Sequence, residues 1–232
     1  MTLTNLAFLL FVAAGSGGLF AKAWSDYRGM MRRRSGLLDG AAGLLFNPSI
    51  TIGQDGFPVL SGTVSDGRRV RIEIIADTLV PRRLPQLWLK VTVHEPSPSP
   101  RPSLGVLARP TGAEFYSLVP GLPEWVAPPF EAEIPLLMRG RCANARDVER
   151  MGAAFRSLFT DVTLKEATIT PGGVRIVRQI AQGDRGAHML YRQIRFPVEA
   201  VRPALVRKAL QDAELLRSAM DYASEHHLPE VA

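Results

Sequence analysis

Arginine is the side chain in this sequence best suited to bind a ligand. The chain has 24 arginines and 4 lysines, and the planar guanidinium group binds phosphate or carboxylate through paired hydrogen bonds. Several arginines fall on two predicted β-hairpins. They make up the candidate anion site: Arg69 and Arg71 in the first hairpin, and Arg175, Arg178, Arg192 and Arg195 in the second.

The alternation of side chains along a strand limits which of these arginines can act together. Residues two apart share a face, so Arg69 and Arg71 point the same way. Arg175 and Arg178 are three apart and point to opposite faces of a regular strand. The alternative to a binding site is a solvated sheet face, on which the arginines pair with acids such as Glu73 and Glu131.

Other motifs for chemistry are missing from the sequence. The histidines have no metal-ligand spacing, and no nucleophile motif occurs. The one cysteine, Cys142, lies between Arg141 and a predicted helix start at Asn144. Such surroundings favour a thiolate, although an ordinary buried cysteine is the simpler interpretation. We therefore predict no catalytic residue, no cofactor and no metal site, and favour a protein that is not an enzyme.

The distribution of charge argues against a nucleic-acid partner. The net charge is +6, of which residues 1–34 carry +4, so the remaining 198 residues are close to neutral. A domain that binds nucleic acid usually has a basic face or stripe. We therefore expect no nucleic acid among the partners.

The N-terminal segment predicts a membrane anchor over residues 4–24. Leu6 to Ala21 contains no charged side chain, and a spanning helix needs about 20 residues. Because the arginines follow this segment, the positive-inside rule predicts a single-pass protein of the bacterial inner membrane, with the N-terminus outside and the C-terminal domain cytoplasmic. The alternative is a signal peptide cleaved near Ala21, which would leave a periplasmic protein.

Two sets of residues in and after this segment predict contacts at the membrane. Ala13, Gly17 and Ala21 recur every four residues, a spacing that lets two membrane helices pack closely. Arg32, Arg33 and Arg34 form a basic cluster that would face anionic lipid. They belong to a basic juxtamembrane segment predicted over residues 25–47.

The remainder, residues 48–232, predicts a soluble α+β domain with a mainly antiparallel sheet. Alternating apolar residues predict strands at 68–75 and 87–95, and Asp66-Gly67 predicts a hairpin turn. Helical spacing of apolar residues predicts two amphipathic helices, over 144–161 and 202–224. The proline-rich stretch at 96–103 is extended and marks a possible sub-boundary.

These features favour a membrane-tethered, non-enzymatic protein. Its cytoplasmic domain would bind a protein partner, as an accessory subunit of an inner-membrane complex or as a homo-oligomer formed through the anchor and the domain. The alternative is a sensor domain that binds an anionic small molecule or a lipid headgroup through the arginine faces.

Overall fold

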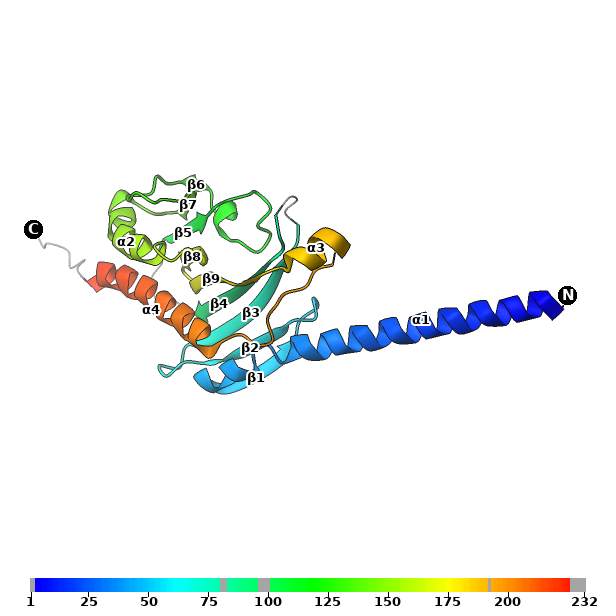
Figure 1. Ribbon diagram of the computed structural model, residues 1–232. Helices are drawn as coiled ribbons and strands as arrows, with labels where there is room; N and C mark the ends of the chain where they lie inside the picture. Colours follow the sequence, from blue (N-terminus) through cyan, green and yellow to red (C-terminus); the bar gives the residue numbers. More distant parts are fainter. Residues whose placement is uncertain (1–2, 80–82, 96–100, 192, 226–232) are drawn as a thin grey trace, which may run out of the picture.

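The computed structural model of the chain describes residues 3–79, 83–95, 101–191 and 193–225, and the side chains of residues 11–220 within these ranges. The fold is α+β. It consists of one antiparallel sheet, a layer of helices on one of its faces, and a long N-terminal helix that projects away from the sheet (Figure 1).

The sheet has nine strands in the order β1-β2-β3-β4-β9-β8-β5-β7-β6. Every pairing in it is antiparallel. The strands are β1 (Phe46–Ile52), β2 (Pro58–Thr63), β3 (Arg69–Asp77), β4 (Gln86–His94), β5 (Ser103–Ala108), β6 (Glu124–Trp125), β7 (Leu136–Arg141), β8 (Leu164–Thr170) and β9 (Gly173–Gln182). The strand that follows β4 in the sheet is β9, which comes about 80 residues later in the chain.

Two tight turns set the register of the sheet. Asp66 and Gly67 connect β2 to β3, and Gly67 has a φ of 84°, which glycine adopts without strain. Gly173 begins β9 with a φ of 136°. A Cβ atom there would lie 2.0 Å from the carbonyl oxygen of Val93, so only glycine fits this approach between β9 and β4.

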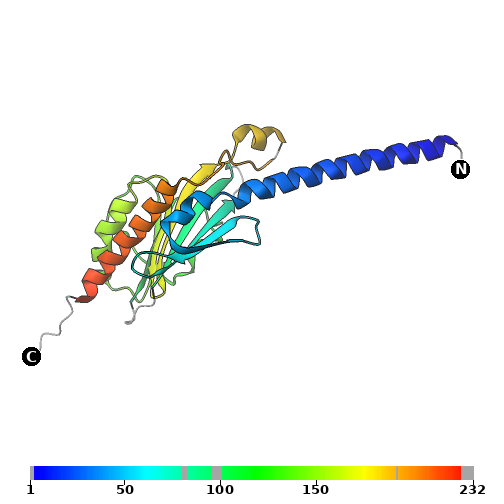
Figure 2. The ribbon, with the colours of Figure 1, turned by 90° about the horizontal axis from the view of Figure 1, so that it is seen from below.

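Helices α2 (Ala145–Leu158) and α4 (Pro203–Glu225) lie side by side on one face of the sheet (Figures 1 and 2). The capping box of Asn144 and Asp147 starts α2: Asp147 N donates to Asn144 Oδ1 at 2.9 Å, and Asn144 N donates to Asp147 Oδ2 at 3.1 Å. The apolar faces of both helices bury Phe155 and Leu216 against Ile72, Val91 and Ile176 of the sheet.

A long connection crosses part of the other face, between β5 and β7. It includes a short 3₁₀ turn, η2 (Val119–Gly121). Tyr116 is buried in it and packs on Trp88, with 6.1 Å between the ring centroids. The rest of this face, over β3, β4 and β9, is called the open face below.

The N-terminal helix α1 (Leu3–Ser35) is followed by a 3₁₀ turn, η1 (Asp39–Leu44), that closes one end of the core. Leu37 and Leu38 are buried there with Leu45. The core therefore draws on residues of the predicted juxtamembrane segment. The last short helix, α3 (Arg185–Tyr191), lies between β9 and α4 in the chain.

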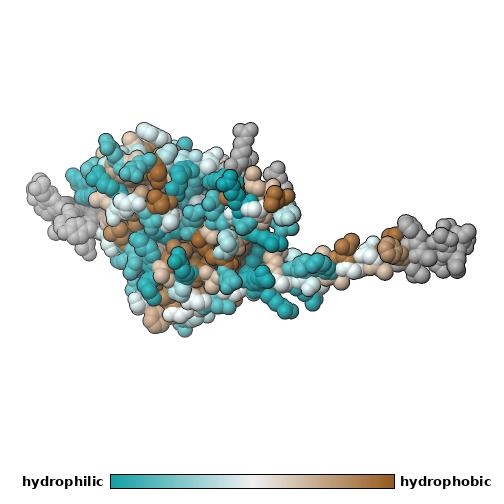
Figure 3. Space-filling view, in the orientation of Figure 1, coloured by the Kyte–Doolittle hydropathy of each residue, from teal (hydrophilic) through white to brown (hydrophobic). Residues whose placement is uncertain are grey.

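The structure contradicts the predicted transmembrane anchor. Among the residues it describes, no helix is both long and apolar enough to cross a membrane. The described side chains of α1 begin at Phe11, and the stretch from there to Ala21 is diluted by Gly15-Ser16-Gly17-Gly18. Charged residues follow from Lys22 onward, and Figure 3 shows this domain-proximal part of α1 as largely hydrophilic.

The side chains of residues 4–10 of the predicted anchor lie outside those described. The predicted single-pass location in the bacterial inner membrane, and the predicted orientation, depended on this anchor. Both predictions therefore lose their structural basis.

Candidate functional site

Three strands bring polar side chains together in one row across the open face. Arg71 of β3 lies opposite Thr92 of β4, and Thr92 lies opposite Arg175 of β9. Arg175 in turn lies opposite Thr168 of β8. Directly opposite residues of an antiparallel sheet share a face, so two arginines from the two predicted hairpins share this row. Arg69 lies on the same face one step along, opposite His94.

The cations of this row differ in their partners. Arg71 donates to Glu73 at 3.2 Å, and Lys90 forms an ion pair with the same carboxylate at 2.7 Å. The predicted pairing of Arg71 with Glu73 is therefore present. Arg175 is half-buried, and its Nε is fully buried with no hydrogen-bond partner in the part of the chain that the structure describes. Within the described residues the side chain of Arg175 makes no hydrogen bond and no ion pair.

A cavity of about 470 Å³ opens beside Arg175. Its floor comes from the sheet, through Ile75, Ala76, Lys90 and Arg175. Its wall is the segment Phe115 to Leu118, and Asp55 reaches it from the β1–β2 turn. Asp55 Oδ1 is engaged there, because it accepts a hydrogen bond from Phe57 N at 3.1 Å. The volume is in the range of ligand pockets, about 300–1,000 Å³.

A buried ion pair fixes the wall of this cavity. Lys165 and Glu114 are each 1% exposed at the side chain, and Lys165 Nζ donates to Glu114 Oε1 at 2.8 Å. Lys165 also donates to the carbonyls of Ala108 and Arg109, both at 2.8 Å. Burial would raise the pKa of Glu114, but hydrogen bonds from Lys165 and Thr111 outweigh it and lower that pKa. The wall is thereby anchored one residue before Phe115.

A β-bulge explains how Lys165 reaches this position. The register of β8 against β9 shifts between Leu164 and Glu166, so Lys165 has no directly opposite residue in the ladder. Bulges re-aim side chains in this way and are common beside functional sites. The sequence gives only a weak signal of this bulge, since the residue pattern of β8 is that of an ordinary strand.

Glu166 is a second buried carboxyl group behind the wall. It is fully buried, and its Oε1 accepts from Thr168 Oγ1 at 3.0 Å, whereas its Oε2 has no partner among the described residues. Burial raises the pKa of Glu166, against the attraction of Arg175 and nearby hydroxyl groups.

The structure does not bring the other predicted arginines to this place. Arg178 lies on the opposite face, 1% exposed, where its Nε donates to Asp212 of α4 at 2.7 Å. Arg195 lies in the segment between α3 and α4, where its carbonyl accepts from Asp184 N. Arg192 lies outside the described residues. The open face therefore holds Arg69, Arg71 and Arg175 of the six.

The residues predicted to contact a membrane all lie on α1. Ala13, Gly17 and Ala21 are exposed, and apart from the adjoining backbone of the helix no described atom lies within 4 Å of a Cβ built on Gly17. Arg32, Arg33 and Arg34 form the last turn of the helix, where cations oppose the negative end of its dipole. The guanidinium group of Arg34 lies over the ring of Phe57, 4.6 Å from its centroid.

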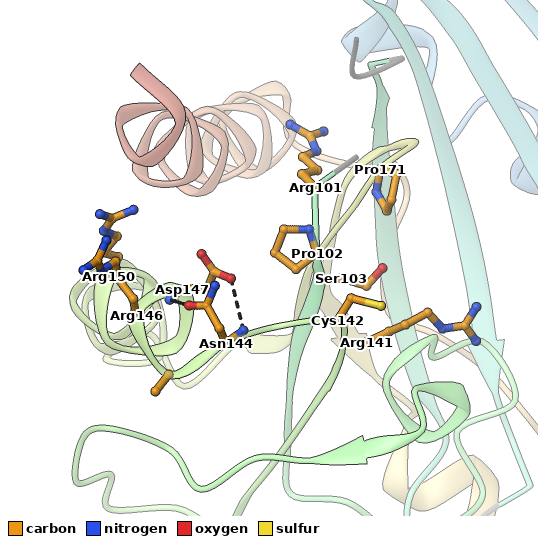
Figure 4. Close-up of a pocket in the computed structure, with 11 residues that line it drawn as sticks. Arg101, Pro102, Ser103, Arg141, Cys142, Asn144, Arg146, Asp147, Arg150 and Pro171 are labelled. Carbon is orange, nitrogen blue, oxygen red and sulfur yellow. Dashed lines mark hydrogen bonds between the residues drawn. The ribbon is translucent and has the colours of Figure 1, made fainter. Parts of the chain in front are cut away.

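A separate hollow of about 770 Å³ surrounds Cys142 at the start of α2 (Figure 4). Cys142 is exposed, contrary to the simpler expectation of a buried cysteine, and has a φ of 56°. Its side chain lies next to Ser103, whereas Arg146 and Arg150 extend from α2 on the far side of Asn144 (Figure 4). No base lies next to the thiol in this view, so the arrangement is not that of an activated nucleophile.

No protein-family model, no curated protein and no solved structure matches this chain. Within the described ranges, no group of three or more histidine, cysteine, aspartate or glutamate residues could hold a metal ion.

Proposed function

We propose that this chain is a non-enzymatic binding protein that takes a small anionic ligand on the open face of its sheet. The observation that carries the proposal is Arg175, a half-buried guanidinium group with a buried, unpaired Nε beside a cavity. A buried donor without a partner costs free energy. A phosphate or carboxylate bound there would satisfy it through charge-assisted hydrogen bonds.

The neighbours of Arg175 support an anion in particular. Lys90 lines the same cavity, and Arg71 lies two strands away in the same row. Thr92 lies between the two arginines and offers a hydroxyl group. Because Glu73 already pairs with Lys90 and Arg71, we assign the main contact to Arg175 and a supporting electrostatic role to the other two.

Calorimetric titration with inorganic phosphate and pyrophosphate tests the proposal. We expect saturable binding that weakens with added salt and that Arg175→Gln reduces at least tenfold, since a hydrogen bond to a charged group contributes about 1.5–3 kcal/mol. Arg207→Gln is the matched control, because Arg207 is exposed on α4 in the opposite layer. Equal binding by the two variants, or no binding by the wild type, would refute the assignment.

A second candidate function is the binding of a protein partner. It is favoured by α3, on which Met189, Leu190 and Tyr191 are 62%, 75% and 71% exposed. Consecutive exposed apolar side chains are typical of interaction surfaces. Leu190→Glu should abolish capture of such a partner in a cross-linking experiment and leave phosphate binding intact.

A further inference from the structure

The geometry points to a more specific ligand for the open face: a planar aromatic group that carries the phosphate or carboxylate. This inference rests on the proposed function and adds a second contact to it. That contact is Phe115, which lines the same cavity as Arg175 and Lys90.

Phe115 is unusual because it is exposed although its surroundings are ordered by hydrogen bonds. The residue is 62% exposed, whereas its neighbour Tyr116 is 6% exposed. The two rings meet edge to face, with 5.3 Å between centroids and 84° between planes. Tyr116 packs in turn on Trp88. Phe115 is therefore the outermost ring of a row of three aromatic side chains, and it has apolar surface left for a further ring.

The position of Phe115 is fixed before any ligand arrives. Glu114, the residue before it, is held by Lys165 at 2.8 Å and by Thr111 N at 2.8 Å. On the other side, Ser117 N donates to the carbonyl of Glu114 at 3.0 Å. A contact residue that is held in place loses little conformational freedom on binding, which strengthens the contact.

The cavity thus combines two kinds of recognition. The sheet offers cationic groups through Arg175 and Lys90, and the wall offers an aromatic ring. A bare inorganic ion would leave the ring of Phe115 in water. A molecule with a ring next to its anionic group would cover it, and apolar burial favours that arrangement.

Titration of the full chain with phenyl phosphate and ethyl phosphate tests this inference. Both probes carry the same anionic group and differ in the ring. We expect phenyl phosphate to bind about tenfold more tightly. Phe115→Ala should bring the ratio of the two affinities close to one and leave the affinity for ethyl phosphate unchanged. Phe46→Ala is the matched control, because Phe46 is 61% exposed on the edge strand β1, and it should keep the wild-type ratio.

The outcomes separate this inference from the proposed function. Equal affinities for the two probes, with binding still lost in Arg175→Gln, would overturn the aromatic ligand and leave the anion site standing. A tenfold preference that persists in Phe115→Ala would place the ring elsewhere and would also overturn it. If neither probe binds the wild type, the anion site fails and the aromatic ligand fails with it. Circular dichroism of each variant checks that the fold is retained.

Discussion

Replacing Arg178 by methionine should destabilise the protein strongly, although the sequence groups this residue with a candidate surface site. Arg178 is 1% exposed and connects β9 to two carboxylates. Its Nε donates to Asp212 Oδ2 at 2.7 Å, and its Nη1 donates to Asp161 Oδ2 at 2.5 Å. Methionine matches the aliphatic part of the side chain, so the main effect is the loss of the charge and its hydrogen bonds.

The magnitude depends on what each carboxylate can do without Arg178. The side chain of Asp161 is 33% exposed and can be hydrated when Arg178 is absent, so it adds little to the loss of stability. The side chain of Asp212 is 2% exposed, and among the described residues it keeps only Lys208, at 2.6 Å. Removing one partner of a buried ion pair costs about 3–5 kcal/mol. Because Lys208 remains, we expect about 3 kcal/mol for Arg178→Met.

Urea unfolding followed by circular dichroism measures this value. The double variant Arg178→Met with Asp212→Leu should recover much of the loss, because it removes the stranded carboxylate as well. Asp161→Asn alone should cost about 1 kcal/mol. A loss below about 1 kcal/mol for Arg178→Met, or a double variant less stable than the single one, would refute the reasoning.

Three further perturbations follow from contacts described above. Lys165→Met leaves the Glu114 carboxylate buried without its cation and should lower the free energy of unfolding, measured in urea, by about 3 kcal/mol. A loss smaller than that of the double variant Lys165→Met with Glu114→Gln would contradict this. Burial would raise the pKa of Asp161, but hydrogen bonds from Thr163 and Arg178 lower it to about 2, so its stabilisation is present above the unfolded value of 3.8 and is lost as the pH falls toward 2. The full shift would be worth about 2.4 kcal/mol; since the carboxylate is a third exposed we expect about 1 kcal/mol, visible as a flatter acid dependence in Asp161→Asn. Gly173→Ala should cost more than about 2 kcal/mol because of its φ and the approach to Val93, whereas Gly172→Ala, whose Cβ would meet its nearest neighbour at 3.9 Å, should unfold like the wild type.

The sequence predicted those strands and helices whose pattern of apolar residues and caps is contained in a short segment of the chain. The alternation at 68–75 and 87–95 corresponds to β3 and β4, and the pattern over 144–161 corresponds to α2 with its cap at Asn144. The stretch Glu114 to Val119, by contrast, forms a loop that leads into a 3₁₀ turn. The ion pair between Glu114 and Lys165 holds it in that form, and no local propensity reports a contact between residues 51 positions apart.

The candidate site required knowledge of the sheet order. Period-two spacing places Arg69 and Arg71 on one face, but only the pairing of β4 with β9 brings Arg175 next to Thr92. The same pairing sends Arg178 to the helical side, where α4 supplies Asp212. The exposure of the Phe115 ring could not be predicted from the sequence either, because the exposure of an aromatic residue in a loop depends on the packing around it.

The position of β9 beside β4 also affects how the chain folds while the ribosome synthesises it. Strands β1 to β4 form a meander from consecutive segments, and β4 then presents a free edge until β9 emerges about 80 residues later. At roughly 5–20 residues per second, this interval lasts roughly 4–16 s. During that time the apolar side of β4, with Leu89 and Val91, is without α4 as well, since α4 follows β9 in the chain. The nascent chain is therefore exposed to edge-to-edge association for seconds, a window in which holding chaperones would protect it.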